Sequence, residues 1–397
     1  MVEVRPFDEV HAEAVFQMRV RTFSAAASGT WDPDEVYIPD ERRLVALDGD
    51  RVVGHLGVWA FAQAYGGRAV PMGGVGAVIV EPTSRGRGVA TALLASGLDL
   101  MREQGDVIST LYPATVVPYR RAGWEMAGQR HWRRMPTRSL LDLPRPADPP
   151  SLRPWVEGDL DEVVALYDTT ALEEAGGLCH AERWLRRHLT PDDDEPEAVT
   201  VAERDGRITG LVQSARVAAT APHSSHDLVV PRFVAADHDT ALALWRHVGT
   251  GWSVARLARL VVAPGEPLLL DLPEQDLDHD RAPDVWMSRL VDVAGAVAAR
   301  GYRDGPRISV PLHIEDPMVG ANCGAAVLEV EDGIGTLTPG GSGRVRVDIG
   351  TLAPLFTGHL TAAALARVGR LPGATDDDIR ALRTAFDGPA PFLRDYF

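Results

Sequence analysis

VGAVIVEPTSRGRGVATALLASGLDLMRE, residues 75–103, is the stretch that decides the fold of this chain. Its β-branched beginning, residues 75–80, predicts a strand that stops at Pro82. The turn at residues 85–88 contains only arginine and glycine, and an amphipathic helix pattern follows at once, with Val89, Leu93, Leu94, Leu98 and Met101 on one face. A glycine-rich turn that leads into a helix directs free N–H groups and the positive helix end at one point. The stretch therefore predicts an anion site suited to a pyrophosphate.

The turn has the pattern R-x-x-G-x-A from Arg85 to Ala90 and follows a V-x-V strand at residues 78–80. In this position it resembles the acetyl-CoA loop of the GNAT N-acetyltransferases, [QR]-x-x-G-x-[GA]. The nucleotide motifs G-x-x-x-x-G-K-[ST] and G-x-G-x-x-G with a later acidic residue fit less well. The alternative is an ordinary strand–turn–helix joint with a fortuitous pair of arginines. The resemblance implies that acetyl-CoA contacts Val78, Ile79, Val80, Arg85, Gly86, Arg87, Gly88, Val89, Ala90 and Thr91.

Composition restricts the class of protein. At 397 residues the chain is long enough for two or three domains, and its formal charge of −16 argues against nucleic acid as a partner. We find no leader pattern and no apolar run of about 18 residues, so we expect a cytoplasmic protein without a membrane partner. Cys179 and Cys323 lie far apart, which indicates neither a disulfide framework nor a zinc cluster. We expect no metal, and we interpret the acidic stretches at residues 191–197 and 276–284 as solvated loops.

The order of predicted elements indicates an α+β protein with modules at residues 1–140, 152–284 and 285–397. A proline-rich linker is predicted at residues 139–154. In the first module, strands at residues 52–62 and 69–80 flank a turn at Gly66 and Gly67, and a further strand at residues 107–113 follows the helix.

The second module resembles a copy of the first. Residues 152–168 repeat the pattern of residues 4–20, and a hairpin is predicted around Asp205 and Gly206. Where a second anion loop should fall, in residues 229–248, the turn contains neither arginine nor glycine. We therefore interpret this module as structural.

The third module begins with residues 286–302, which we interpret as an amphipathic helix. Short strands alternate with glycine and proline turns in residues 307–349. Two helical stretches follow at residues 351–371 and 376–388. The pattern predicts a sheet covered by helices on one face.

Over its whole length the chain resembles the Eis family of N-acetyltransferases. The matching motifs are V-x-V-x-P-T-x-R-x-R-G at residues 78–88, Y-x-R-x-G-[WY] at residues 119–124, W-x-x-x-L-V-D-V at residues 286–293 and a terminal phenylalanine. The resemblance implies two GNAT modules, of which only the first is active, and a C-terminal domain like sterol carrier proteins. It also implies acetyl-CoA as co-substrate, a small-molecule amine as acceptor, and a hexamer.

Acetyl transfer from a thioester to an amine needs a donor to the developing oxyanion, a base for the ammonium and an acid for the thiolate. We expect the N–H of Val80 to polarise the thioester carbonyl. The resemblance implies Tyr119 as the acid and the terminal carboxylate of Phe397 as the base. The alternatives are a tyrosine that only packs the turn and a tail that is free in solvent. Ala114 and Thr115 occupy the place of the family's S-E pair before the tyrosine, and we expect them at the cofactor.

The expected acceptor site departs from that of aminoglycoside-acetylating family members. These have an acidic residue shortly after an F-[TS] pair and another just before the terminal phenylalanine, whereas here Phe23-Ser24 precedes Ala25 and Tyr396 precedes Phe397. Other acidic residues could lie nearby, namely Asp32, Asp34, Glu35 and Asp395. We expect Phe23, Trp31 and Tyr396 at the substrate, which favours a less charged or more apolar amine.

Three other interpretations stay open: a lipid or apolar-ligand carrier built on the C-terminal module, a non-catalytic acetyl-CoA-binding protein, and an enzyme that acetylates a protein or peptide. Aminoglycoside acetylation, and with it antibiotic resistance, also remains open.

Overall fold

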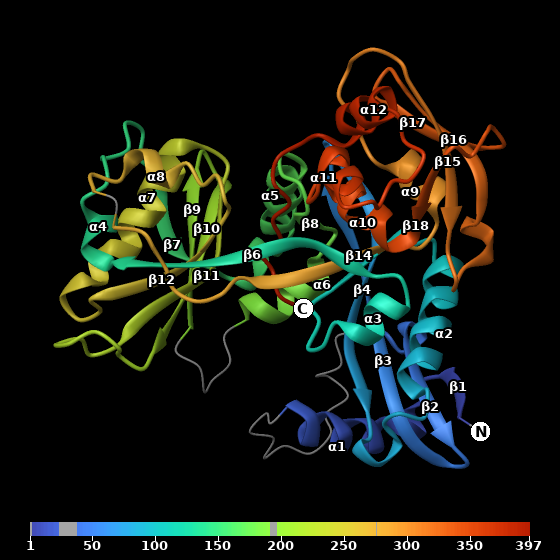
Figure 1. The fold of residues 1–397 in the computed structure, drawn as a ribbon. Coiled ribbons are helices and arrows are strands. Elements are labelled where there is room, and N and C mark those ends of the chain that lie inside the picture. The colour runs from blue at the N-terminus through green and yellow to red at the C-terminus, as the bar shows by residue number, and fades with distance from the viewer. Residues whose placement is uncertain (1, 24–37, 191–196, 275) are drawn as a thin grey trace. The chain divides into compact units, whose positions relative to one another are not determined.

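The computed structural model describes residues 2–23, 38–190, 197–274 and 276–397, which form two compact units. The first unit consists of Met1–Gly128, Val285–Pro391 and Phe397, and the second of Gln129–Asp284 and Phe392–Tyr396. Both units combine strands with helices (Figure 1), so the predicted α+β class is confirmed. None of the described helices has the length and apolar character needed to cross a lipid bilayer.

The first unit is built on a sheet in which β4 and β5 are parallel and the other neighbours are antiparallel. The strands predicted at residues 52–62, 69–80 and 107–113 are found as β3, β4 and β5. In sheet order the strands are β1 (Glu3–Pro6), β2 (Arg43–Asp48), β3 (Arg51–Tyr65), β4 (Arg68–Val80), β5 (Ile108–Leu111) and β14 (Asp284–Leu290). The helices are α1 (Ala12–Phe23), α2 (Val89–Glu103) and α3 (Val117–Arg121).

The two faces of this sheet bury different helices. In β2, Leu44 and Ala46 belong to the core that contains the apolar face of α2. Val45 and Leu47, which alternate with them, pack with α1. Because successive strand residues point to opposite faces, α1 and α2 cover opposite sides of the sheet. The five residues predicted to form the buried face of α2 are each at most 1% exposed, so that prediction is confirmed.

β4 and β5 pair over a short distance only. The parallel register runs from Met72 opposite Ile108 to Gly74 opposite Thr110. Beyond that point β4 continues through residues 75–80 without a partner in β5. The free length of β4 ends at Val80, and a short 3-10 helix (Pro82–Ser84) connects it to the arginine–glycine turn and α2.

A β-bulge deforms the free length of β4. The register with β3 shifts between the pairs of His55 and Gly57, and Ala77 has a φ of +50°. The buried His55 side chain donates from Nδ1 to the carbonyl oxygen of Ala77 at 3.1 Å and accepts at Nε2 from Arg43 at 3.4 Å. The neutral imidazole therefore satisfies both neighbours and holds the bulge in place.

Residues 286–302 are not one helix, and this prediction was wrong. Residues up to Leu290 form strand β14, which pairs antiparallel with β5, and the helix α9 (Val293–Ala299) begins only after its cap Asp292. All side chains from Trp286 to Leu290 are buried. A strand that is covered on both faces lacks the polar–apolar alternation that identifies a strand at a surface, and its apolar run continues into α9.

The rest of the first unit is the C-terminal α+β segment. Its predicted strands are present, but the helix predicted at residues 351–371 is divided in two at Gly358, which has a φ of +79°. A four-stranded sheet has the order β17 (Ile334–Pro339), β16 (Gly324–Glu331), β15 (Ile308–Glu315), β18 (Val345–Asp348). The helices α10 (Ile349–Thr357), α11 (Ala362–Arg367) and α12 (Asp376–Phe386) follow.

The second unit repeats the strand order of the first. Its strands are β7 (Ser151–Pro154), β9 (Glu197–Arg204), β10 (Arg207–Val217), β11 (Asp227–Ala235), β12 (Leu257–Val262) and β6 (Glu125–Pro136), of which the first four residues of β6 belong to the first unit. β11 and β12 are parallel and pair only from Leu228 to Val230, as β4 and β5 do in the first unit. The helices are α5 (Leu160–Leu172), α6 (Glu182–Leu189), α7 (His238–Gly249) and α8 (Leu268–Asp271). The predicted hairpin at Asp205 and Gly206 is the β9–β10 turn.

The predicted linker at residues 139–154 is largely part of the second unit. It begins inside the short helix α4 (Thr137–Leu141) and ends as β7. Leu140 and Leu143 are buried in a hydrophobic core. Apolar side chains between the prolines therefore pack instead of leaving the segment extended in solvent.

Acid should weaken the first unit through His55. Burial, with a smaller effect from the charge of Arg43, lowers the pKa of His55 from 6.5 to about 4. Between these values the unfolded chain binds a proton that the folded protein does not. Stability from the neutral ring is therefore full above about pH 6.5 and falls as the pH decreases towards 4. We expect a loss of about 1–2 kcal/mol between pH 7 and pH 5.

Urea unfolding at pH 7, 6 and 5 measures this loss. The His55→Gln variant, which can still donate to Ala77 but does not titrate, should show a correspondingly weaker pH dependence than the wild type. His180→Gln is the control, because the side chain of His180 is 66% exposed. Identical pH dependence in wild type and His55→Gln would contradict the assignment.

Candidate active site

The N-terminus of α2 is open. Its cap is Gly88, which has a φ of +82° and offers no side chain to the helix, and the first intrahelical bond is donated by Ala92 to Gly88. A Cβ built at Gly86 or Gly88 would meet no atom within 4 Å among the described residues. The N–H groups of Val89, Ala90 and Thr91 thus lie at an uncapped helix start with free space around the preceding turn. This arrangement can bind an anion by backbone donors and the helix dipole.

The two arginines of the turn differ in their surroundings. Arg87 forms a 2.9 Å ion pair with Asp48 of β2, and both side chains are partly exposed. Arg85 is exposed and has no ion-pair or side-chain hydrogen-bond partner within the described part of the chain. Arg85 is therefore the side chain available to an incoming phosphate, whereas part of the charge of Arg87 is already compensated.

The equivalent helix of the second unit is closed. Asp237 caps α7, and its carboxylate accepts from the N–H of Thr240 at 2.8 Å and from Arg204 at 2.8 Å. A carboxylate of the protein thus occupies the anion position at the helix start. This agrees with the interpretation that the second module does not bind a phosphate at this helix.

Tyr119 lies on the one-and-a-half-turn helix α3 in the core shared with α2. The side chain is 8% exposed, and burial raises the pKa of its hydroxyl above the usual value of 10. The chain turns directly after it, because Trp124 and Ala122 both donate backbone hydrogen bonds to the Tyr119 carbonyl at 3.0 Å. The phenol therefore stays protonated at neutral pH, as a proton donor must.

The ring of the terminal Phe397 packs on the sheet of the first unit. Its centroid lies 5.2 Å from that of Phe61 on β3 and 5.9 Å from that of Tyr112 just after β5, both edge-to-face. Trp59 stacks on Phe61 with a centroid distance of 5.6 Å. Gly74 of β4, at the last β4–β5 pair, leaves room for the ring. We call the four aromatic residues Trp59, Phe61, Tyr112 and Phe397 the aromatic cluster.

The preceding tail segment, Phe392–Tyr396, is anchored in the second unit. Arg394 donates to the carbonyl oxygen of Phe233 at 3.1 Å and forms an ion pair with Glu174. Asp395 is 2% exposed and pairs with the buried Arg232 at 3.3 Å. Arg232 and Phe233 lie on β11 beyond its last pair with β12, so the free length of β11 holds a segment of the chain itself.

The remaining predicted site residues are distributed as follows. Val78 and Val80 pack partly buried against the α2 core, and Ile79 on the opposite face is buried. Ala114 and Thr115 are exposed in the loop between β5 and α3.

Of the residues predicted at the substrate, Tyr396 is 55% exposed and belongs to the second unit. Trp31 lies outside the described residues, as do Asp32, Asp34 and Glu35. Phe23 ends α1, and its side chain is likewise not described.

Sequence reasoning missed Trp59, Phe61, Tyr112 and Gly74. The alternation W-x-F in a predicted strand places Trp59 and Phe61 on one face and could have indicated an aromatic surface. No local signal points to Gly74, since its role depends on a ring from the other end of the chain.

Two other features do not coincide with these residues. A cavity of about 730 Å³ borders α1 and the β2–β3 turn, is lined in part by Arg5, His11 and Arg51, and includes none of the predicted site residues. The described residues contain no group of three or more histidine, cysteine or acidic side chains placed to hold a metal ion.

Comparison with protein-family models finds three matches along the chain. Residues 3–127 and 176–290 each match an acetyltransferase (GNAT) domain, and residues 293–394 match a sterol carrier protein domain. The predicted architecture, two GNAT-type modules followed by a sterol-carrier-like domain, is therefore confirmed.

Relatives match over most of their length. An uncharacterized N-acetyltransferase of Streptomyces coelicolor is 30% identical over 70% of this chain and 69% of its own. N-acetyltransferase Eis of Mycobacterium bovis is 25% identical over 89% of each chain. The crystal structure of a GCN5-related N-acetyltransferase from Kribbella flavida is 34% identical and superposes with a TM-score of 0.88, covering 100% of this chain and 98% of that chain.

A methyl group at Gly74 should loosen the chain end. A Cβ there would lie 2.9 Å from the Phe61 ring and 3.0 Å from the Phe397 ring, and Phe397 can yield because it is the last residue. We expect a carboxypeptidase that removes aromatic C-terminal residues to release phenylalanine from Gly74→Ala several-fold faster than from the wild type. Gly76→Ala is the control, since its Cβ would meet Trp59 at an ordinary 3.5 Å. Equal release from all three proteins would show that the packing at Gly74 does not hold the tail.

Proposed function

We propose that this chain, which belongs to the GCN5-related N-acetyltransferases of the Eis type, transfers the acetyl group of acetyl-CoA to a primary amine of a small molecule. The observation that supports this most directly is the contrast between the two modules. The first has an uncapped helix start with Arg85 beside the free length of β4, whereas the second has a carboxylate in that place.

GNAT acetyltransferases use acetyl-CoA. In this proposal the pyrophosphate binds at the N–H groups that begin α2, with Arg85 as the charged partner. The pantetheine arm pairs with β4 at residues 78–80, which have no partner in β5. The N–H of Val80 then donates to the thioester oxygen and stabilises the oxyanion as it develops.

The reaction is a direct transfer. The neutral amine attacks the thioester carbonyl carbon, the new C–N bond forms, and the C–S bond breaks. The carboxylate of Phe397 accepts the proton of the ammonium, directly or through water, and Tyr119 protonates the leaving thiolate. The raised pKa of Tyr119 supports its role as the acid, and the docking of the Phe397 ring on β4 and β3 supports a defined position for the chain end.

The aromatic cluster suggests the class of acceptor. Trp59 and Tyr112 are partly exposed aromatic rings near the terminal residue, and aromatic ring faces can also attract an ammonium group. The acidic residues of aminoglycoside-acetylating relatives are replaced by Ala25 and Tyr396. We therefore propose an arylalkyl or other apolar amine in preference to a polycationic drug. We also propose that the protein is a cytoplasmic hexamer, and this part of the proposal rests only on its resemblance to the Eis family.

A thiol-release assay with acetyl-CoA tests the chemistry. The acceptors are an arylalkylamine, a hydrazide, an aminoglycoside and a lysine peptide, offered to wild type, Tyr119→Phe and a chain with one alanine appended after Phe397. We expect the arylalkylamine to be the best acceptor and kcat to fall by about 10²–10⁴-fold in Tyr119→Phe, because general acid catalysis contributes that much. The appended residue replaces the carboxylate by an amide and should have a comparable effect.

Each contrary result has a specific meaning. Full activity of the chain with the appended residue would contradict the assignment of the terminal carboxylate as the base. Full activity of Tyr119→Phe would contradict the assignment of Tyr119 as the acid. A protein that ignores every amine and extracts lipid from vesicles would instead be a carrier.

Arg85 should contribute more to cofactor binding than Arg87. Arg85→Ala removes the proposed contact between a guanidinium and the pyrophosphate, so we expect it to raise the KM for acetyl-CoA about 10-fold. Arg87→Ala should raise the KM less, because the guanidinium of Arg87 already pairs with Asp48. Initial rates at varied acetyl-CoA measure both. A larger effect from Arg87 would reverse the assignment, and no effect from either would contradict a pyrophosphate site at this turn.

A further inference from the structure

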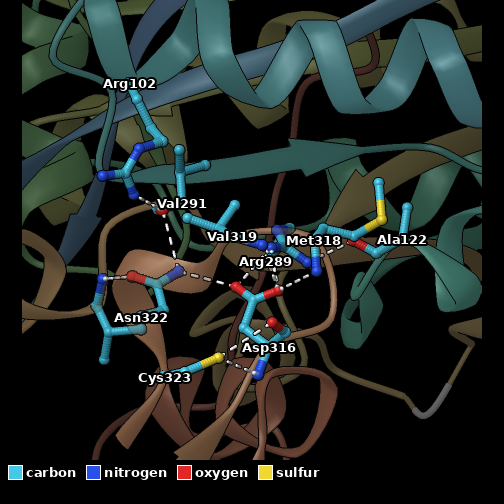
Figure 2. Close-up of polar contacts among 10 residues, drawn as sticks. Arg102, Ala122, Arg289, Val291, Asp316, Met318, Val319, Asn322 and Cys323 are labelled. Atoms are coloured by element: carbon cyan, nitrogen blue, oxygen red, sulfur yellow. Dashed lines mark hydrogen bonds and ion pairs between the residues drawn. The ribbon is translucent and has the colours of Figure 1, made fainter.

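A buried arginine connects the C-terminal segment of the first unit to the turn after Tyr119. Arg289 of β14 is fully buried, and its guanidinium donates to the carbonyl oxygen of Ala122, the C-cap of α3. It also lies 5.5 Å from the ring of Trp124. A Cβ at Gly123, whose φ is +90°, would lie 1.8 Å from the guanidinium, so the turn and the arginine are closely fitted. Figure 2 shows Arg289 and its contact with Ala122.

The guanidinium is itself held by Asp316. The carboxylate accepts two hydrogen bonds from Arg289, at 2.7 and 2.8 Å, one from the amide of Asn322 at 2.8 Å, and backbone bonds from Met318 and Val319 at 3.0 and 3.1 Å (Figure 2). Burial raises the pKa of Asp316, but the hydrogen bonds and charge of Arg289 outweigh it and leave the pKa lowered. The pair therefore stays charged at neutral pH and has little freedom to move.

Stability alone does not account for the ion pair of Arg289 and Asp316. A buried ion pair can often be replaced by apolar side chains at little cost in stability, so its presence is weak evidence for a stabilising role. α3, in contrast, is only five residues long and has no side-chain cap at its N-cap Val116. So short a helix does not hold its own geometry and depends on tertiary contacts at its ends.

We propose that Arg289, fixed by Asp316, is a positioning residue for Tyr119: it holds the C-terminal turn of α3 and thereby sets the place of the phenol that donates the proton. This inference rests on the proposed function. In this proposal Arg289 acts through the backbone from Ala122 to Tyr119. None of its contacts described above is with the arginine–glycine turn at residues 85–88. A small misplacement of a catalytic group lowers kcat strongly and leaves cofactor binding unchanged.

A double-mutant cycle tests the coupling. kcat and the KM for acetyl-CoA are measured for wild type, Arg289→Met, Tyr119→Phe and the double variant. We expect Arg289→Met to lower kcat about 10- to 100-fold with an unchanged KM, and to have almost no further effect when Tyr119 is already phenylalanine. Arg289→Lys, which keeps a donor in place, should recover part of the activity.

Arg300→Met is the matched control. Arg300 is 4% exposed and also donates to a carbonyl of a helix, that of Phe356 in α10, at 2.6 Å. Arg300→Met should lower the thermal midpoint of unfolding, as Arg289→Met does. Any loss of kcat that Arg300→Met causes should, however, be equally large in the wild type and in Tyr119→Phe. If Arg289→Met fails to fold, Asp316→Asn replaces it in the cycle.

The outcomes separate this inference from the proposed function. If Tyr119→Phe reduces kcat and the effect of Arg289→Met is equally large in both backgrounds, Arg289 has a structural role only, and the positioning role is overturned while the acid stands. If Tyr119→Phe retains full activity, the proposed acid fails, and the positioning role fails with it.

Discussion

The separation of β4 from β5 is the constraint on which the rest of the first unit depends. The two strands pair only from Met72 to Gly74, and the bulge at Ala77, held by His55, shifts the register in which the remainder of β4 pairs with β3. Because α2 follows β4 closely and its N-cap, Gly88, has no side chain, strand backbone without a partner in β5 and an open helix start lie close together in sequence. The ring of Phe397 lies where the separation begins.

The second unit keeps this geometry and uses it differently. β11 and β12 also separate after three pairs, but the helix that follows begins with the carboxylate of Asp237, and the free length of β11 binds Arg394 and Asp395 of the chain's own tail. At this helix start and along this strand, the second unit therefore has contacts within the protein where the described part of the first has none. The strand order is the same in both units, so the difference lies in a few residues and not in the fold.

Local signals in the sequence predicted most of the elements and the turn before α2, because strand, glycine turn and amphipathic helix each leave a pattern within a few residues. β14 could not be recognised in this way, since a strand buried on both faces has no alternation and precedes a helix directly. The contacts of Arg289 were also beyond sequence reasoning. A charged residue in the middle of an apolar run has no meaning until its partner, Asp316, and its acceptor, Ala122, are placed beside it.

β14 also limits how such genes can be rearranged. It lies at the C-terminal end of the second GNAT match in sequence, yet it pairs with β5 in the sheet of the first unit, and Met287 and Val291 belong to the same core as α2. Recombination at the boundary between the first and second modules would therefore separate a sheet from one of its own strands. Hybrids between relatives can keep a complete fold only when the first and third modules come from the same parent. The second module, which is inserted between them, can be exchanged only if its contacts with the C-terminal tail are retained.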